Sequence, residues 1–375
     1  MTNRERVNAI LSFEQYDRMP IVDFGFNKRA LENWHIQGHI TETELADSGD
    51  GGAGERIVER KLGFDFNWQG GFELRPNTGL LPPFEEKVIK TFPDGIKHVV
   101  TGNGSIAGVK EGISCIPQDV GTLLEDRKAW EELFLPKLQY SVERILALTN
   151  SGLPKEKNKL QNPRGIHCGS LYGLIRDMTG VQELAYLQAD DEDLYNEIID
   201  TIGNLCYAVT KAALETGYEF DYAHFWEDIC FKNGPLVNPK LFYERVGPHY
   251  QKITSLLHEY GIRFVSLDCD GFIEHLIPAW LDNGVNVMFP LEVGTWGADI
   301  AGLRKKFGKG LLAVGGMDKR AFTVEGYGAV DREVERMRRL ADLGGYIPCP
   351  DHRMPPDAKW ENVQRYCERM RAAFG

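Results

Sequence analysis

The chain has 375 residues, of which 42% are hydrophobic, so it can bury a large core. Its 43 basic and 55 acidic residues give a net charge of −12, which argues against nucleic acid or an anionic membrane as partner, because both bind positive patches. No apolar run reaches the ~18 residues of a membrane-spanning helix and the N-terminus lacks signal-peptide features, so we expect a cytoplasmic protein.

Short apolar segments recur from the N-terminus onward. Thr2 and Glu5 form a capping-box pattern at the start of a predicted N-terminal helix, whose apolar side includes Val7 and Leu11. Segments of strand-like composition then follow along the whole chain. The predicted strands are residues 19–25, 64–68, 164–171, 220–228, 263–268, 285–291, 310–316 and 345–349.

Helical patterns separate the later strands, and most of them stop at a glycine. A long helix is predicted from about residue 181 to Gly217. A second helical region starts at Asn238-Pro239, where proline takes the first helical position, and it ends at Gly261 with an expected break at Gly247-Pro248. The remaining predicted helices are 272–283, 299–307 and 328–343.

The later strands end in polar clusters that helices then follow. This pattern is typical of a (β/α)8 TIM barrel, whose reactive groups lie at the carboxyl ends of the strands. Between about 72 and 117, Pro and Gly turns separate short alternating stretches, which predicts inserted antiparallel hairpins acting as a lid, a subunit contact or a surface decoration. We therefore predict one α/β domain, residues 1–375, with an N-terminal helical extension and this inserted region.

Two carboxylates follow the strand at 263–268. Asp268 and Asp270 are two residues apart, so both should face the same side of the strand, with Cys269 facing the opposite side. Two carboxylates this close resist joint ionisation, which favours either a shared proton or a bound cation. His352, after the last strand, could meet them across the barrel mouth and complete a catalytic zinc site. The alternative is that both Asp residues cap the next helix and His352 only hydrogen-bonds one of them.

Other strand ends supply further candidates. Glu227 could donate a proton or bind a metal ion with help from His224, or could form a salt bridge to a neighbouring strand. Glu292 could orient the Asp pair, and Lys319 could bind a substrate carboxylate, as could its neighbour Arg320. Additional candidates for the pocket are Tyr172 and Arg176, and an aromatic set of Phe24, Phe26, Trp34, Trp68, Trp226 and Trp296.

The seven cysteines are scattered singly and none forms a CxxC pair. This spacing indicates neither a disulfide framework nor a structural zinc finger, so we expect reduced thiols.

Several segments, in order along nearly the whole chain, carry a resemblance to a known family. They resemble the uroporphyrinogen decarboxylase superfamily, in particular its corrinoid-dependent methyltransferases and O-demethylases. The segments are RERVNAILSFEQYDRMP, WEDICFKNGPLVNP, FVSLDCDG, VNVMFPLEVG, FGKGLLAVGGMDKR and GGYIPCPDHRMPPDAKWENV.

Two departures from the family's patterns guide the expected reaction. The arginine-rich stretch that holds porphyrinogen carboxylates in true decarboxylases is replaced here by DFGFNKRALENW. Thiol-methylating members hold zinc through a His-x-Cys pair and a later Cys, and Asp268, Asp270 and His352 fall on those three positions. Because carboxylates make a harder site than thiolates, the resemblance implies a substrate that presents an oxygen atom.

The resemblance therefore implies transfer of a methyl group from a methyl ether, most plausibly an aryl methyl ether, to the cob(I)alamin of a separate corrinoid protein. Asp268, Asp270, His352 and Glu227 are the expected catalytic groups, and the first three could hold zinc. The expected substrate contacts are His224, Trp226, Tyr172, Arg176, Lys319 and Glu292.

Two other functions remain open at the level of sequence. One is a decarboxylase acting on a porphyrinogen or a smaller acid, and the other is a non-catalytic binding barrel. A homodimer is the default assembly.

Overall fold

The computed structural model describes residues 1–72, 74–110 and 118–375. Six parallel strands form one sheet in the order β14-β13-β12-β11-β8-β7, and two more pair in parallel as β1-β2. Each of the eight segments predicted as strands overlaps one of these strands. Their bounds are Val22–Asp23 (β1), Phe66–Asn67 (β2), Gly165–His167 (β7), Tyr222–Trp226 (β8), Phe264–Asp268 (β11), Val287–Leu291 (β12), Leu312–Met317 (β13) and Tyr346–Pro350 (β14).

The strands close into the predicted (β/α)8 barrel. Phe26 and Met354 form a parallel bridge between the segments that follow β1 and β14. Met354 donates its backbone N–H to the Gly25 carbonyl, and Asn27 donates to the Met354 carbonyl, each at 3.1 Å. On the other side, the 3-10 helix η1 (Gln69–Phe72) lies between β2 and β7. The contacts of η1 with both β2 and β7 thus complete the circle on the side where no strand pairing joins these two strands.

The predicted helices are present, with three differences, and the structure adds further helices, among them the C-terminal α16 (Trp360–Phe374). The predicted helix 181–217 is two helices, because Asp191 leaves the helical conformation and caps the second one. The region 239–259 is helical throughout: residues 242–246 form a wide π-type turn, which accommodates the missing N–H of Pro248 without the predicted break. The helix predicted at 272–283 begins only at Ile277.

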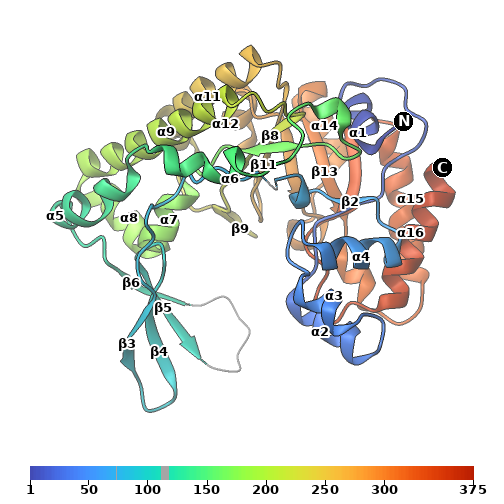
Figure 1. The fold of residues 1–375 in the computed structure, drawn as a ribbon, viewed down its shortest axis with the longest axis horizontal. Helices are drawn as coiled ribbons and strands as arrows, with labels where there is room; N and C mark the ends of the chain where they lie inside the picture. The colour runs from blue at the N-terminus through green and yellow to red at the C-terminus, as the bar shows by residue number, and fades with distance from the viewer. Residues whose placement is uncertain (73, 111–117) are drawn as a thin grey trace.

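The helices surround the barrel (Figure 1). They are α1 (Asn3–Leu11), α2 (Lys28–Ile36), α3 (Glu42–Ala46), α4 (Ala53–Leu62), α5 (Arg127–Ala129), α6 (Leu146–Thr149), α7 (Gly173–Thr179), α8 (Val181–Asp190), α9 (Glu192–Glu215), α10 (Pro239–Leu241), α11 (Gly247–Glu259), α12 (Ile277–Asp282), α13 (Val293–Trp296), α14 (Ile300–Phe307), α15 (Gly328–Ala341) and α16 (Trp360–Phe374). In the described ranges, none of them has the length and apolar character needed to cross a membrane.

Alternation along the strands divides the core into an interior and a helix-facing layer. Inside the barrel, Phe264, Val287 and Phe289 pack together with Val7 and Leu11 of α1, which therefore closes the amino-terminal end of the barrel. The intervening residues of the same strands face the helices and belong to larger clusters with them. This period-two division determines which strand-end side chains reach the barrel mouth.

An antiparallel four-stranded sheet projects away from the barrel (Figure 1). It contains β3 (Lys87–Thr91), β4 (Ile96–Val100), β5 (Ser105–Lys110) and β6 (Gln118–Thr122), between β2 and β7 in the chain. The hairpins predicted at 72–117 are therefore present but begin later and continue to Thr122. Residues 73 and 111–117 of the predicted range lie outside the described residues. Thr122 anchors the sheet by donating its hydroxyl to the Met178 carbonyl at the end of α7.

Candidate active site at the barrel mouth

A cavity of about 410 Å³ opens at the carboxyl ends of the strands. A volume of this size suits a small organic molecule. Side chains from five of the strand ends, from η1 and from the neighbouring loops line it. The lining residues are Phe24, Asp50, Gln69, Arg75, His167, His224, Trp226, Asp228, Asp268, Asp270, His352 and Arg353.

Asp268 and Asp270 face this cavity together, as their spacing predicts. Cys269 between them points to the helix-facing layer. The Gln69 side-chain amide donates a hydrogen bond of 2.8 Å to Asp268 Oδ2. Burial raises the pKa of Asp268 well above its usual range, and the neighbouring Asp270 and Asp228 carboxylates raise it further. The site therefore favours the protonated form of Asp268.

His352 joins the pair from the segment after β14. Its Nε2 lies 3.1 Å from Asp270 Oδ2, and both side chains are about one-third exposed. The other oxygen, Asp270 Oδ1, is buried and has no hydrogen-bond partner among the described residues. Asp268, Asp270 and His352 thus line one cavity, with Asp268 beside the hydrogen-bonded pair of Asp270 and His352.

The fit of these three side chains to a metal ion is poor in this arrangement. Within the described part of the chain, only Asp23, Glu55 and Glu59 bring three potential ligand atoms within 4.8 Å of one another. Asp268 is instead held by Gln69, away from such a group. The three positions that the family resemblance assigned to zinc therefore do not form a metal centre as they lie.

Two uncharged histidines form the inner wall of the cavity. His167 Nδ1 accepts the Gly169 backbone N–H at 3.1 Å, so the ring proton of the neutral form is on Nε2. Burial and the nearby Arg75 charge lower the pKa of His167 to about 3. Burial also lowers the pKa of His224 well below its usual value, and its Nδ1 lies 3.1 Å from Ser266 Oγ. Both rings remain neutral at pH 7 and are hydrogen-bonding groups.

Aromatic side chains complete the walls. Phe24 packs against Phe289 at 4.5 Å between ring centroids and against His352 at 5.5 Å. Trp226 lines the cavity with the Arg176 guanidinium 5.5 Å from its ring. The other members of the predicted aromatic set lie elsewhere. Phe26 and Trp34 belong to the helix-facing core, Trp68 to the barrel interior, and Trp296 packs on Phe272.

The cationic groups at the cavity are Arg75 and Arg353, and this corrects the expectation for Lys319 and Arg320. Arg353 forms an ion pair with Asp50, at 2.5 and 2.8 Å. Arg75 lies 6.0 Å from the Phe72 ring and has no hydrogen bond or ion pair with a described residue. Lys319 does not line the cavity, and Arg320 pairs with Asp318.

Glu227 has a structural position rather than a catalytic one. It is fully buried, faces away from the cavity, and accepts the backbone N–H groups of Leu171, Tyr172 and Gly173 at the start of α7. The Tyr250 hydroxyl also donates to it. Because these donors use the carboxylate oxygens, Glu227 cannot reach a substrate, which corrects the expectation of a proton donor or metal ligand.

Three predicted substrate contacts also lie outside the lining. Tyr172 is 1% exposed and accepts a hydrogen bond from the Tyr195 hydroxyl. Arg176 supports the wall from behind through Trp226 and a 3.5 Å contact with Asp228. Glu292 accepts the Gly271 N–H at 2.6 Å, which orients the turn just after Asp270. That last contact agrees with the orienting role considered for Glu292.

The sequence analysis missed five cavity residues, which are Asp50, Gln69, Arg75, His167 and Arg353. His167 lies within the predicted strand 164–171 and is the last residue of the shorter observed strand β7. Gln69 and Arg75 lie in the irregular segment after β2, where no periodic pattern predicts direction. Asp228 carries a separate signal: its φ of +47° is a left-handed conformation that is uncommon for a non-glycine residue.

Comparison with known families agrees with this geometry. Residues 167–373 match the family model described as uroporphyrinogen decarboxylase (URO-D). The match covers more than half of the chain and includes His224, Asp268, Asp270 and His352. The chain belongs to the uroporphyrinogen decarboxylase family. Membership of this family of enzymes supports the expectation of an enzyme, whereas a search of curated proteins finds no match.

Solved structures similar to this URO-D family chain include methyltransferases. A methyltransferase from Methanosarcina mazei aligns over 99% of both chains with 15% identity and a TM-score of 0.57. A B12-independent methionine synthase from Shewanella sp. W3-18-1 aligns over 95% of this chain and 98% of its own, with 12% identity and a TM-score of 0.49. A putative vitamin-B12-independent methionine synthase from Listeria monocytogenes aligns over 96% and 100%, with 12% identity and a TM-score of 0.44. At 15% identity, the likeness to the first structure concerns the fold.

Proposed function

We propose that this URO-D family protein transfers a methyl group from an aryl methyl ether to the cob(I)alamin of a separate corrinoid protein. The observation that carries the proposal is the position of Asp268, a buried carboxyl group with a raised pKa, in a small cavity with aromatic walls. A methyltransferase from M. mazei with the same fold is consistent with methyl transfer on this scaffold.

The reaction requires an acid because phenolate is a poor leaving group. The conjugate acid of a phenolate has a pKa of about 10. The corrinoid supplies the electron pair that forms the new bond to the methyl carbon. As that bond forms, the methyl–oxygen bond breaks, its electron pair stays on the phenolic oxygen, and the Asp268 proton moves to that oxygen. The products are a phenol, an ionised Asp268 and the methylated corrinoid.

The surrounding side chains stabilise the charges that this transfer creates. The Gln69 amide donates to Asp268 Oδ2, so the carboxyl proton belongs on Oδ1, and the same amide stabilises the carboxylate afterwards. The nearby Arg353 charge lowers the Asp268 pKa and therefore also favours the ionised product state. The His352–Asp270 pair can return a proton to Asp268 before the next turnover.

Zinc has no step in this mechanism, because the expected ligands do not form a metal centre as they lie. If the His352 and Asp270 side chains rearranged on binding zinc, the ion would act as a Lewis acid on the same ether oxygen.

Porphyrinogen decarboxylation is disfavoured by the charges of the cavity. Among the described residues that line it, the carboxyl groups of Asp50, Asp228 and Asp270 add to that of Asp268, which favours its protonated form, and the cations are Arg75 and Arg353. A substrate with several carboxylates would meet like charges there and find few partners.

The test combines the purified protein with cob(I)alamin and a panel of methoxylated aromatic compounds, and follows the loss of cob(I)alamin by its absorbance. We expect methyl transfer with the wild type. In Asp268→Asn the rate of transfer should decrease about 10²–10⁴-fold, which is the usual contribution of a general acid to the rate. Transfer should also fall as the pH rises through the raised pKa of Asp268, because only the protonated carboxyl donates. The control is Asp282→Asn, an exposed carboxylate at the end of α12.

A nitro-substituted aryl methyl ether gives a second control, because its phenolate leaves with little protonation. The rate of methyl transfer from this ether should be much less sensitive to Asp268→Asn. Absence of transfer across the whole panel would overturn the proposal. Release of CO2 from carboxylic acids without corrinoid would then favour the decarboxylase.

A further inference from the structure

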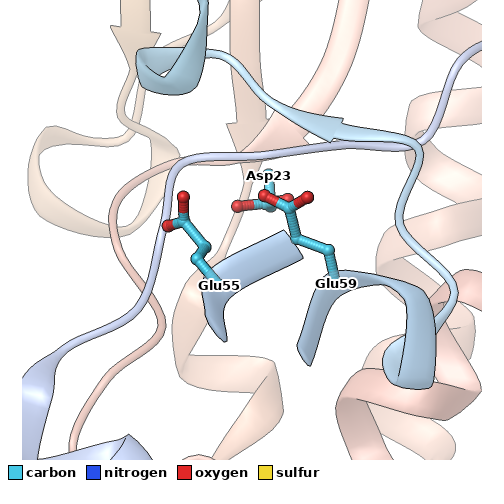
Figure 2. A group of neighbouring side chains, drawn as sticks. All are labelled: Asp23, Glu55 and Glu59. Carbon is cyan, nitrogen blue, oxygen red and sulfur yellow. The ribbon is translucent and has the colours of Figure 1, made fainter. Parts of the chain in front are cut away.

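Three buried carboxyl groups meet outside the barrel mouth, and no step of the proposed reaction uses them. Asp23 belongs to β1, whereas Glu55 and Glu59 lie one turn apart on α4. One oxygen from each lies within 4.8 Å of the others. Figure 2 shows the Glu59 carboxyl group next to that of Asp23, with the Glu55 carboxyl group on the other side of Asp23 from the Glu59 backbone. We call Asp23, Glu55 and Glu59 the acidic triad.

One oxygen of the triad lacks a partner. Asp23 is fully buried, and its Oδ1 accepts the Gly25 backbone N–H at 2.7 Å. Its Oδ2 is also buried and has no hydrogen-bond donor among the described residues. An unsatisfied buried carboxylate oxygen is costly, so this atom requires either a proton or a cation.

The glutamates are held in place by neighbouring donors. Glu55 accepts the Gly51 N–H at 2.7 Å and the Asn67 side-chain amide at 2.9 Å. A hydrogen bond from the Asn67 backbone also lowers the Glu59 pKa. These contacts fix the direction of both side chains, so the three carboxyl groups form a preorganised group.

The electrostatic environment favours an added positive charge. Burial is the largest cause that raises the pKa of each triad member, to about 8 for Glu55 and about 7 for Glu59, and it raises that of Asp23 well above its usual range. Asp50 contributes a further negative charge nearby. The Arg56 charge lowers the Glu59 pKa without offsetting burial, and its guanidinium donates to the Gly51 carbonyl.

A route for an ion exists on the outer side of the barrel. Glu55 and Glu59 line a second cavity of about 250 Å³, bounded also by Gly51, Asn67 and Arg164. This cavity has different lining residues from the barrel mouth. An ion can therefore reach the triad from solvent without passing the candidate active site.

We propose that the acidic triad binds a divalent cation that prefers oxygen ligands, of the size of Mn²⁺ or Ca²⁺. The donor set contains only carboxylate oxygens, which select hard cations over thiolate-binding metals. Oxygens on opposite sides of one Ca²⁺ ion are about 4.6–5.2 Å apart for bonds of 2.3–2.6 Å, so the observed span requires little movement. Water from the outer cavity would fill the remaining positions.

The bound cation would help to position Gln69, which contacts Asp268 at the barrel mouth. Asn67 contacts both Glu55 and Asp50 through its side-chain amide, and its Oδ1 accepts the Gln69 backbone N–H at 2.8 Å. Gln69 in turn donates to Asp268. A cation that joins β1 to α4 therefore stabilises the segment from which Gln69 reaches Asp268. The inference stands independently of the proposed reaction.

The test measures Mn²⁺ binding to the metal-free full-length protein by electron paramagnetic resonance, together with the thermal unfolding midpoint. We expect the wild type to bind Mn²⁺ and to unfold at a higher temperature in its presence. Glu59→Gln should bind Mn²⁺ at least 10-fold more weakly and lose most of the thermal shift. Glu42→Gln removes an exposed carboxylate of α3 and should behave like the wild type.

Two further measurements make the outcome decisive. Circular dichroism should show Glu59→Gln folded without metal, because removal of a buried charge relieves repulsion. Asp270→Asn should retain the Mn²⁺ site, which separates the triad from the barrel mouth. The proposal is overturned if the wild type binds neither Mn²⁺ nor Ca²⁺, or if binding survives in Glu59→Gln and disappears in Asp270→Asn.

Discussion

Arg75 illustrates how a single residue can indicate the substrate. Its guanidinium lines the barrel mouth without a hydrogen bond or ion pair to a described residue, although Asp50 and Asp268 are near enough to influence it. Burial lowers its pKa, which means that the folded protein bears a cost for keeping this charge. A substrate carboxylate would supply the missing partner. Lys319, which sequence reasoning assigned to this task, lies outside the cavity.

Replacement of Arg75 should therefore distinguish charged from neutral substrates. In Arg75→Gln we expect the KM for a methoxybenzoate to rise about 10- to 100-fold, since a hydrogen bond to a charged group contributes about 1.5–3 kcal/mol. The KM for neutral methoxybenzene should stay within about twofold. Steady-state kinetics on both substrates provide the measurement, with the exposed Arg332→Gln as matched control. Equal losses on both substrates would contradict a carboxylate-binding role.

At the scale of one element, successive residues of β8 and the two that follow it point alternately into the barrel and toward the helices. His224, Trp226 and Asp228 line the cavity, whereas Phe225 and Glu227 face the helices. The period of two that correctly directed Asp268 and Cys269 would also have directed Glu227 away from the barrel. There its carboxylate accepts the free N–H groups at the start of α7, where a helix favours negative charge.

The variant Glu227→Gln should accordingly destabilise the fold. In the wild type, both Glu227 oxygens accept hydrogen bonds from backbone N–H groups or the Tyr250 hydroxyl. In either orientation of the introduced amide, its NH2 group would face some of these donors, and burial leaves no water to replace the lost hydrogen bonds. We expect the free energy of unfolding to fall by about 1–3 kcal/mol. Urea unfolding measures this, with Glu183→Gln on the exposed face of α8 as control. Unchanged stability combined with lost turnover would instead favour the catalytic role first expected.

At the scale of the whole molecule, barrel closure and the candidate site share one contact region. Gly25 accepts the Met354 N–H that joins β1 to the segment after β14. Its φ is +84°, and a Cβ added there would lie 2.6 Å from an Arg353 nitrogen and 2.8 Å from an Asp50 oxygen. The ion pair that lines the cavity is thus packed directly against the closure of the barrel.

Gly25→Ala tests this connection, and Gly38→Ala is a close control. Gly38 has the same φ of +84° but nothing within 4 Å of an added Cβ. Both variants should lose about 1–2 kcal/mol of stability, the cost of a left-handed alanine. Only Gly25→Ala should also weaken substrate binding, by displacing Arg353 and Asp50. Calorimetric titration and urea unfolding measure the two effects, and equal substrate affinity in both variants would argue against the connection.

The sequence by itself determined the barrel and much of its mouth. Strand positions, the capping box at Thr2 and the opposite directions of Asp268 and Cys269 follow from local periodicity, because a strand exposes alternate residues to two environments. Parallel strands then bring their carboxyl ends to one rim, which is why Asp268, Asp270 and His352 share a cavity although 82 residues separate the last two.

Only the tertiary structure decided the partners of these side chains. The hydrogen bond from Gln69 to Asp268 and the lack of a described hydrogen-bond or ion-pair partner for Arg75 depend on the segment after β2. No periodic pattern in the sequence predicts the direction of side chains in that segment. The acidic triad joins one residue of β1 to two of α4, and neither element alone gives a sign that the carboxyl groups meet. Burial then raises their pKa values, because the penalty on a charge depends on what surrounds it in three dimensions.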